Sequence, residues 1–332
     1  MDFSKKCKTP VSCAGRDPRI ELFRCCMMFG ICLLHALEQG GYADSHRGLD
    51  NLMTPCVDGF VFISGYYGIK LKLKGVLKLL GIGAYCALFV GVVYHWLYLS
   101  APVKDIATGI WRCFKEPWFL WTYLALMLCA PLLESVFQET AKDKWSVMRK
   151  VAPILFMVFA WSYAATKIPV LKKFTPCVSE FGGFGLLTFA GIYLAAGTCR
   201  YYEVDKKVTT TALLALATLS GAFCWFNFMH YHSPFALIFS GSLFFLFRRM
   251  KLANDGIIAR AAVWLGPSMF SVYLLHFNDM GMSFLHCFED KYIAVWGYYP
   301  VCFAVAIALF VFGVVADGVR RLAVGGGGRE KR

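Results

Sequence analysis

The sequence is poor in charged residues and has no long polar segment. Only 17% of its 332 residues are Asp, Glu, Lys or Arg, whereas a soluble domain of this size carries about a quarter. Hydrophobic residues make up 58% of the chain, and the mean hydropathy is +0.56. The apolar residues come in continuous runs rather than in alternation, which argues against a transmembrane β-barrel. These features exclude an ordinary soluble domain and predict an all-α, polytopic transmembrane helical bundle.

Short catalytic and metal-binding signatures are also missing. There is no glycine-rich phosphate loop, no GxSxG nucleophile elbow and no HExxH zinc helix. Most of the 14 cysteines fall inside apolar segments, where they act as small hydrophobic residues, and Cys7 and Cys13 lack metal-ligand spacing. His230 and His232 flank a turn without a carboxylate or cysteine cluster beside them. The sequence therefore predicts no metal site.

The apolar segments predict ten membrane spans. They cover about residues 20–38, 51–68, 76–99, 117–136, 151–166, 182–199, 208–229, 232–247, 262–286 and 293–317. With a cytoplasmic N-terminus, 25 of the 34 Lys and Arg residues fall on the cytoplasmic side. This bias favours an even number of spans with both termini in the cytoplasm. It also accounts for the net charge of +13 without nucleic acid as a partner.

The spans predict a simple division of the chain. Residues 1–19 form a cytoplasmic N-terminal segment, and residues 20–318 form a single transmembrane domain. Residues 319–332, which end in GGGGREKR, form a flexible basic tail. No segment between the spans is long enough for a second domain, so any activity must lie in the bundle.

The first span carries two polar residues that are costly to place in a membrane. Arg24 and His35 lie eleven positions apart, which places them on one helix face and about 16 Å apart along the axis. Such residues usually face a bundle interior or a water-filled cavity. Glu21 can pair with Arg24, and Glu38 can orient His35. A simpler interpretation stays open, with an interfacial Arg–Glu pair and a histidine hydrogen-bonded in the core.

The second span contains two further polar residues and is followed by lysines. An unpaired carboxylate at Asp58 is costly at membrane depth, whereas Ser64 beside a glycine is typical of close helix packing. Lys70, Lys72 and Lys74 come next, on the cytoplasmic side. These lysines either set topology and bind anionic lipid, or bind the phosphates of a cytoplasmic donor molecule.

Aromatic residues and a histidine stand out in later spans. Trp118, Trp121 and Tyr123 fit an aromatic belt at the outer membrane interface, and Trp118 is also a candidate for a substrate cavity. His276 lies in the ninth span after a Gly-Pro pair that can bend the helix. Two alternatives remain for His276, which faces either a cavity or a packing partner.

Several segments, in this order, resemble the membrane-bound acyltransferase family three, the multispan O-acyltransferases of bacterial envelopes. Arg24 and His35 reproduce the family's pattern of an arginine, ten residues and a histidine in the first span. The other similar segments are VDGFVFISGYYG, PWFLWTYLALMLCAPLL, LTFAGIYLAAGTCRYY and SMFSVYLLH. The resemblance covers about residues 18–315. One departure is that the loop after the second span carries lysines where many members have arginines, and a lysine is a point charge rather than a bidentate fork.

The resemblance implies an O-acyltransferase of the bacterial cytoplasmic membrane. The enzyme would move an acyl group, most often acetyl, from cytoplasmic acyl-CoA to a hydroxyl of an envelope polysaccharide or a lipid-linked glycan. Acyl-CoA (acetyl-CoA) is a donor substrate, no permanently bound cofactor is expected, and membrane lipids surround the bundle. His35 would be the general base. Arg24, anchored by Glu21, would either hold donor phosphate, together with the lysines of 70–74, or order the cavity. The candidate cavity residues are Asp58, Ser64, Trp118 and His276.

A transporter or flippase of an envelope precursor is the alternative interpretation. Ten spans with buried charges also suit a substrate pathway through the membrane. Against it, the sequence shows neither two-fold symmetry nor a pair of broken helices. A lipid-binding scaffold is a third interpretation, but it leaves Arg24 and His35 unexplained.

Overall fold

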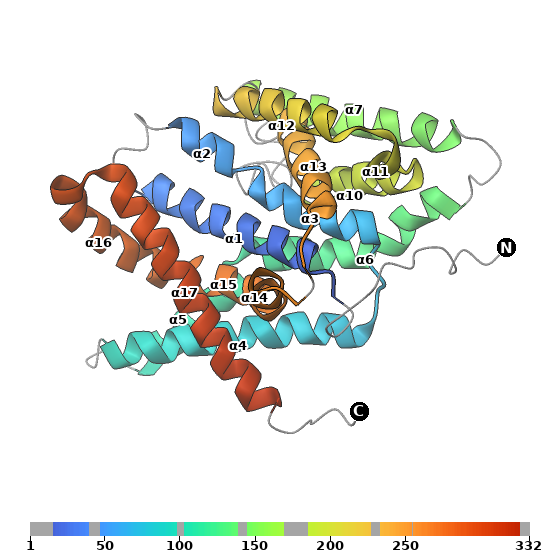
Figure 1. The fold of residues 1–332 in the computed structure, drawn as a ribbon. Coiled ribbons are helices and arrows are strands. Elements are labelled where there is room, and N and C mark those ends of the chain that lie inside the picture. The colour runs from blue at the N-terminus through green and yellow to red at the C-terminus, as the bar shows by residue number, and fades with distance from the viewer. Residues whose placement is uncertain are drawn as a thin grey trace.

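The computed structural model describes residues 16–39, 47–97, 103–138, 145–168, 185–226, 233–253 and 255–325. Within these ranges, helices are the only regular secondary structure. The long helices pack side by side as a bundle (Figure 1). This confirms the predicted all-α class.

The helices are, in chain order, α1 (Pro18–Gln39), α2 (Arg47–Met53), α3 (Cys56–Tyr67), α4 (Leu73–Leu97), α5 (Val103–Lys115), α6 (Trp118–Gln138), α7 (Ser146–Lys167), α10 (Leu186–Tyr201), α11 (Val204–Lys207), α12 (Thr210–Trp225), α13 (Pro234–Arg249), α14 (Ile257–Leu265), η3 (Gly266–Ser268), α15 (Met269–His276), α16 (Asp279–Trp296) and α17 (Tyr298–Gly325). Every predicted span falls on at least one of them. Helix α17 extends into the predicted tail as far as Gly325, and the rest of the tail lies outside the described residues.

Five segments are long and apolar enough to cross a membrane. Among the described residues these are Pro18–Glu38, Leu73–Val93, Trp118–Phe137, Ile257–His276 and Tyr298–Ala323. A shorter apolar helix covers Thr210–Trp225. The chain is thus a multispan membrane protein, while the total of ten spans and the side of each terminus stay predictions.

The second predicted span is two helices rather than one. Helices α2 and α3 are separated by a turn at Thr54 and Pro55. Proline has no backbone N–H and disfavours helical geometry in the preceding residue, so the helix breaks here. The Pro55 carbonyl accepts a hydrogen bond from Ser240 on α13 at 2.6 Å. Helix α3, which carries Asp58 and Ser64, is therefore short and tied to α13 at its start.

The boundaries of the ninth and tenth predicted spans were wrong. The ninth span ends at His276, and α16 then occupies the end of the predicted ninth span and the start of the tenth. The Asn278 side chain donates to the carbonyls of Leu274 and Leu275 at 3.4 and 3.0 Å. These bonds satisfy carbonyls of the last turn of α15 that have no partner within the helix, so the helix can end there.

Helix α5 was not predicted from the sequence patterns. It follows α4 and folds back along it (Figure 1), with Ile110 against Gly91 and Phe114 against Gly83. The two glycines let the helices approach closely, as small residues do at membrane helix interfaces. Helix α5 is short and amphipathic, with Lys104 and Arg112 on its exposed side, so it lacks the apolar length that identifies a membrane span.

Helix α1 lies in the interior of the bundle. It packs against α3, α13, α14, α15 and α17, and most of its residues are buried. Phe23 is fully buried and packs on the rings of Phe244 and Phe247, with centroids 5.8 and 5.4 Å away. The helix that carries Arg24 and His35 is therefore a central element.

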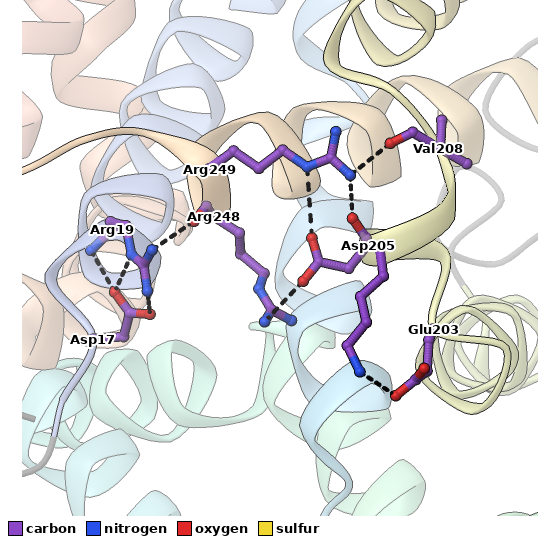
Figure 2. A network of polar contacts seen from close by, with 8 residues as sticks. Asp17, Arg19, Glu203, Asp205, Val208, Arg248 and Arg249 are labelled. Carbon is purple, nitrogen blue, oxygen red and sulfur yellow. Dashed lines mark hydrogen bonds and ion pairs between the residues drawn. The ribbon is translucent and has the colours of Figure 1, made fainter. Parts of the chain in front are cut away.

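A polar network closes the end of the bundle at which α1 begins, which we call the basal end. Arg19 donates to Asp17 through Nε at 2.9 Å and Nη2 at 2.8 Å, and to the Arg248 carbonyl at 2.7 Å (Figure 2). Asp205 on α11 receives Arg248 at 3.1 Å and Arg249 at 3.7 Å. Burial acts to raise the pKa of Asp17, but the hydrogen bonds from Arg19 and the positive charges of Arg19 and Arg248 together lower that pKa. The network ties the start of α1 to α11 and to the end of α13.

Candidate functional site

Two histidines from α1 and α15 meet inside the bundle. His35 Nδ1 lies 2.9 Å from His276 Nε2, and His276 Nδ1 lies 2.6 Å from the Val272 carbonyl oxygen. Only 6% of His35 and 1% of His276 is exposed. His276 therefore forms part of a buried histidine pair, although the two residues are 241 positions apart.

The break between α14 and α15 positions this pair. Gly266 at the start of η3 lies against the Glu21 side chain, and His276 at the end of α15 meets His35. The segment therefore runs beside α1 in the same direction. At Phe277 the backbone leaves helical geometry, with φ −85° and ψ 74°. The histidine thus ends α15 at the level of His35.

Aromatic rings surround His35. The ring centroids of Phe277 and Tyr273 lie 4.7 and 6.5 Å from that of His35, and the two aromatic rings stack on each other at 5.3 Å. Glu38, which we expected to orient His35, is exposed and makes no hydrogen bond to it. Among the described residues, the hydrogen-bond partner of His35 is His276 instead.

Glu21 and Arg24 form the predicted ion pair. Arg24 Nη1 lies 3.1 Å from Glu21 Oε1, and Arg16 Nη1 lies 3.3 Å from the same oxygen. The Glu21 side chain is 5% exposed, whereas that of Arg24 is 33% exposed. The buried carboxylate thus anchors an arginine whose side chain is partly exposed on a mostly buried helix.

Ser64 binds Tyr123 rather than only allowing close packing. Ser64 Oγ lies 3.1 Å from the Phe60 carbonyl and 2.9 Å from the Tyr123 hydroxyl. Because a carbonyl only accepts, the single Ser64 proton goes to Phe60, and Tyr123 donates to Ser64. Tyr123 therefore faces α3 inside the bundle, and its assignment to an outer aromatic belt was wrong.

The two tryptophans of the same helix behave differently from each other. Trp118 packs on the rings of Phe119 and Phe189, with centroids 5.8 and 5.9 Å away. Trp121 is 41% exposed, and its Nε1 donates to the Lys115 carbonyl at 3.0 Å. Trp118 thus packs against the core, while Trp121 lies on the outside of the bundle.

Asp58 is buried but is not joined to the other candidate residues. Only 3% of it is exposed, and its Oδ1 has no hydrogen-bond partner among the described residues. The structure does not bring Asp58 into contact with His35 or Arg24, so its role in a substrate cavity stays a prediction.

A clamp of three side chains holds the turn between α3 and α4. Tyr193 accepts a hydrogen bond from the Ile69 amide at 2.9 Å and donates to Glu134 at 2.8 Å, and Arg200 donates to Glu134 at 2.7 Å. Gly68 begins the turn with φ +76°, a conformation that glycine adopts without strain. We call Glu134, Tyr193 and Arg200 the clamp.

The predicted donor lysines extend from this turn. Lys70, Lys72 and Lys74 are exposed, and none of them takes part in an ion pair among the described residues. No contact joins them to Arg24 or His35. They lie at the basal end, and the clamp holds the backbone of the turn from which they extend.

The described residues contain no group of three or more His, Cys, Asp or Glu side chains that could hold a metal ion. His46, His230 and His232 lie outside the described part of the chain.

The ion pair of the clamp could have been predicted from the sequence. Glu134 and Arg200 are opposite charges at the ends of predicted spans that finish on the same side of the membrane.

The chain was compared with protein families, curated proteins and solved structures. A family model described as an acyltransferase domain matches residues 17–316. No curated protein and no solved structure gave a match. The matched region contains the histidine pair, the Glu21–Arg24 ion pair, Tyr123 and the clamp.

Proposed function

Because the chain belongs to the acyltransferase 3 family, we propose that it moves an acetyl group from cytoplasmic acetyl-CoA to a hydroxyl of an envelope polysaccharide or lipid-linked glycan. The coarser statement, a membrane-bound acyltransferase, follows from the family and from the five candidate spans. The observation that carries the proposal is the buried His35–His276 pair on the helix that also holds Arg24.

His35 is proposed as the general base. Histidine has an ordinary pKa close to neutral, which suits proton transfer at physiological pH. It takes the proton from the acceptor hydroxyl as the hydroxyl oxygen attacks the thioester carbonyl. The carbon–sulfur bond then breaks, and the CoA sulfur leaves with the proton that His35 returns. The products are the acetyl ester and CoA, and no other reactant is needed.

Arg24 is proposed to hold the phosphates of the donor. Its guanidinium is anchored by Glu21 and remains 33% exposed. Arg24 and His35 lie about 16 Å apart along the helix axis. Coenzyme A carries its phosphates at one end and its thioester at the other, separated by the pantetheine arm. A donor bound along α1 would therefore place its phosphates near Arg24 and its thioester near His35.

The basal end would receive the donor from the cytoplasm. Lys70, Lys72 and Lys74 project there without acidic partners among the described residues. An unneutralised cationic rim raises the local concentration of a polyanion such as CoA. This arrangement supports a cytoplasmic donor.

Purified protein with labelled acetyl-CoA tests the proposal. The protein is reconstituted with an envelope glycan fraction, and mass spectrometry follows both free CoA and acetyl esters on the glycan. We expect transfer by the wild type and a loss of at least about 100-fold in the His35→Gln variant, since general base catalysis contributes about 10²–10⁴-fold. His95→Gln is the matched control, because it makes the same change at a histidine of α4 outside the pair. A transporter would produce neither free CoA nor acetyl esters, and that result would overturn the proposal.

A further inference from the structure

The hydrogen bonds of the histidine pair determine which nitrogen atoms carry protons. His276 Nδ1 lies 2.6 Å from the Val272 carbonyl oxygen. A carbonyl oxygen only accepts hydrogen bonds, so His276 Nδ1 must carry a proton. His276 Nε2 faces His35 Nδ1 at 2.9 Å. One proton lies between these two nitrogens. It belongs to His276 if His276 is positively charged, and to His35 if His276 is neutral.

The surroundings favour a neutral His276. The residue is 1% exposed, and no described carboxylate forms a hydrogen bond or ion pair with either ring. Burying an imidazolium without an anionic partner is far more costly than burying a neutral ring. A neutral His276 with a proton on Nδ1 has a lone pair on Nε2. The proton between the rings therefore belongs to His35 Nδ1, which donates to His276.

This assignment leaves the other nitrogen of His35 free to act as a base. With Nδ1 protonated, Nε2 of a neutral His35 carries the lone pair. Nε2 has no hydrogen-bond partner among the described residues. It is also absent from the set of polar atoms that are both covered and without a partner, so Nε2 itself is not covered. The small accessible part of the ring therefore includes Nε2. The basic nitrogen is therefore accessible although the residue as a whole is buried.

We propose that His276 is a positioning residue that holds His35 in the tautomer with a basic Nε2, through a chain running from the Val272 carbonyl to His276 and on to His35. The inference rests on the proposed function, in which His35 is the base. When His35 accepts the proton of the acceptor hydroxyl at Nε2, its Nδ1–H becomes a stronger donor to His276. His276 keeps its own Nδ1 proton throughout, and His35 returns the Nε2 proton to the leaving sulfur. His276 touches neither the donor nor the acceptor.

Two amide substitutions separate the two ends of His276. In His276→Asn the side-chain amide reaches the place of Nδ1, so it can keep the bond to Val272 but offers no acceptor to His35. In His276→Gln the amide reaches the place of Nε2, so its oxygen can accept from His35 Nδ1. We expect kcat/KM to fall about 100-fold in the Asn variant and within about tenfold in the Gln variant, with the donor KM unchanged in both.

Nitrogen NMR of the protein labelled with ¹⁵N-histidine provides a readout that does not depend on activity. The chain has 7 histidines, and the His35 signals are those that vanish in His35→Gln. We expect a protonated Nδ1 and an unprotonated Nε2 in the wild type, and a loss of that preference in His276→Asn but not in His276→Gln. Since both substitutions could disturb the core equally, thermal unfolding of the two variants is compared first.

The outcomes distinguish this inference from the proposed function. A wild-type His35 protonated on Nε2 would overturn it, and so would equal kcat/KM in the two amide variants. If no acyl transfer is seen in the wild type, the proposed function fails, and the NMR measurement still decides whether His276 sets the tautomer of His35. Transfer by the wild type together with an unchanged tautomer in His276→Asn would retain the function and reject the positioning role.

Discussion

The Glu21 carboxylate lies against the backbone of Gly266, where a Cβ atom would overlap both its Oε2 atom and its carboxyl carbon. Oε1 of the same carboxylate binds Arg24 at 3.1 Å. The orientation of the arginine therefore depends on the absence of a side chain at residue 266. This contact also joins α1 to the break between α14 and α15. The far end of α15 carries His276. One glycine thus couples the two polar groups of the candidate site.

Gly266→Ala should weaken donor binding by displacing Glu21 from its place. We expect the donor KM to rise about tenfold, which corresponds to about 1.4 kcal/mol, with a smaller change in kcat. The measurement is steady-state kinetics with acetyl-CoA. Gly81→Ala is the matched control, because a Cβ there meets nothing within 4 Å. Equal kinetics in the two variants would show that the contact between Glu21 and Gly266 does not affect the donor site.

Arg24→Lys should impair the enzyme although the charge is kept. A planar guanidinium can bind Glu21 and a phosphate together, whereas an ammonium is a flexible point donor. We expect a donor KM raised about tenfold, and Glu21→Gln should act in the same direction. Because both changes affect one interaction, the double variant should lose less than the sum of the single losses. Arg320→Lys, at an ion pair with Asp317 on α17, is the control. Wild-type kinetics in Arg24→Lys would mean that charge alone matters.

Tyr193→Phe should destabilise the protein through the clamp. The substitution removes the hydroxyl that accepts from the Ile69 amide and donates to Glu134. Leaving a partly buried donor and acceptor unpaired costs about 1–3 kcal/mol, so the midpoint of thermal unfolding in detergent should fall. Tyr292→Phe is the control, because the Tyr292 hydroxyl makes no hydrogen bond in the described part of the chain. An equal midpoint in the two variants would contradict a structural role for the clamp.

The central place of α1 could be predicted from its sequence because two ionisable residues in an apolar helix must avoid lipid. The partner of His35 could not be predicted in the same way. Both histidines lie in the outer half of spans that were expected to run in the same direction, which places them at similar depth. Depth does not say which helices are neighbours, and the break at Gly266 that brings α15 against α1 is a tertiary contact.

The mistaken assignment of Tyr123 has a physical reason that the sequence already contained. Trp121 and Tyr123 are two positions apart, which turns them by about 200° around a helix. They face nearly opposite sides, so only one of them can belong to an outer belt. Trp121 is exposed, and Tyr123 bonds to Ser64. Helix α5 was not predicted for a different reason. A short amphipathic helix has no run of apolar residues long enough to be recognised as a membrane span.

The exposed lysines after α3 should capture the donor by electrostatic attraction. Replacing Lys70, Lys72 and Lys74 together with glutamine should raise the donor KM and flatten its dependence on salt. Attraction between charges extends about 8 Å at physiological salt, so the lysines can act without touching CoA. The matched control replaces Lys104, Arg112 and Lys115 with glutamine, which removes the same charge from α5. That control should leave the donor KM and its salt dependence unchanged.

The competing account is that these lysines only set the topology of the chain. Cysteine-accessibility mapping of α3 and α4 in the triple variant separates the two accounts. We expect unchanged topology together with weaker, less salt-dependent donor binding. If α3 and α4 invert in the membrane, the lysines act through topology and the steering hypothesis is wrong. Unchanged topology with unchanged donor kinetics would also reject the steering hypothesis, because the three lysines would then affect neither the topology of the chain nor the capture of the donor.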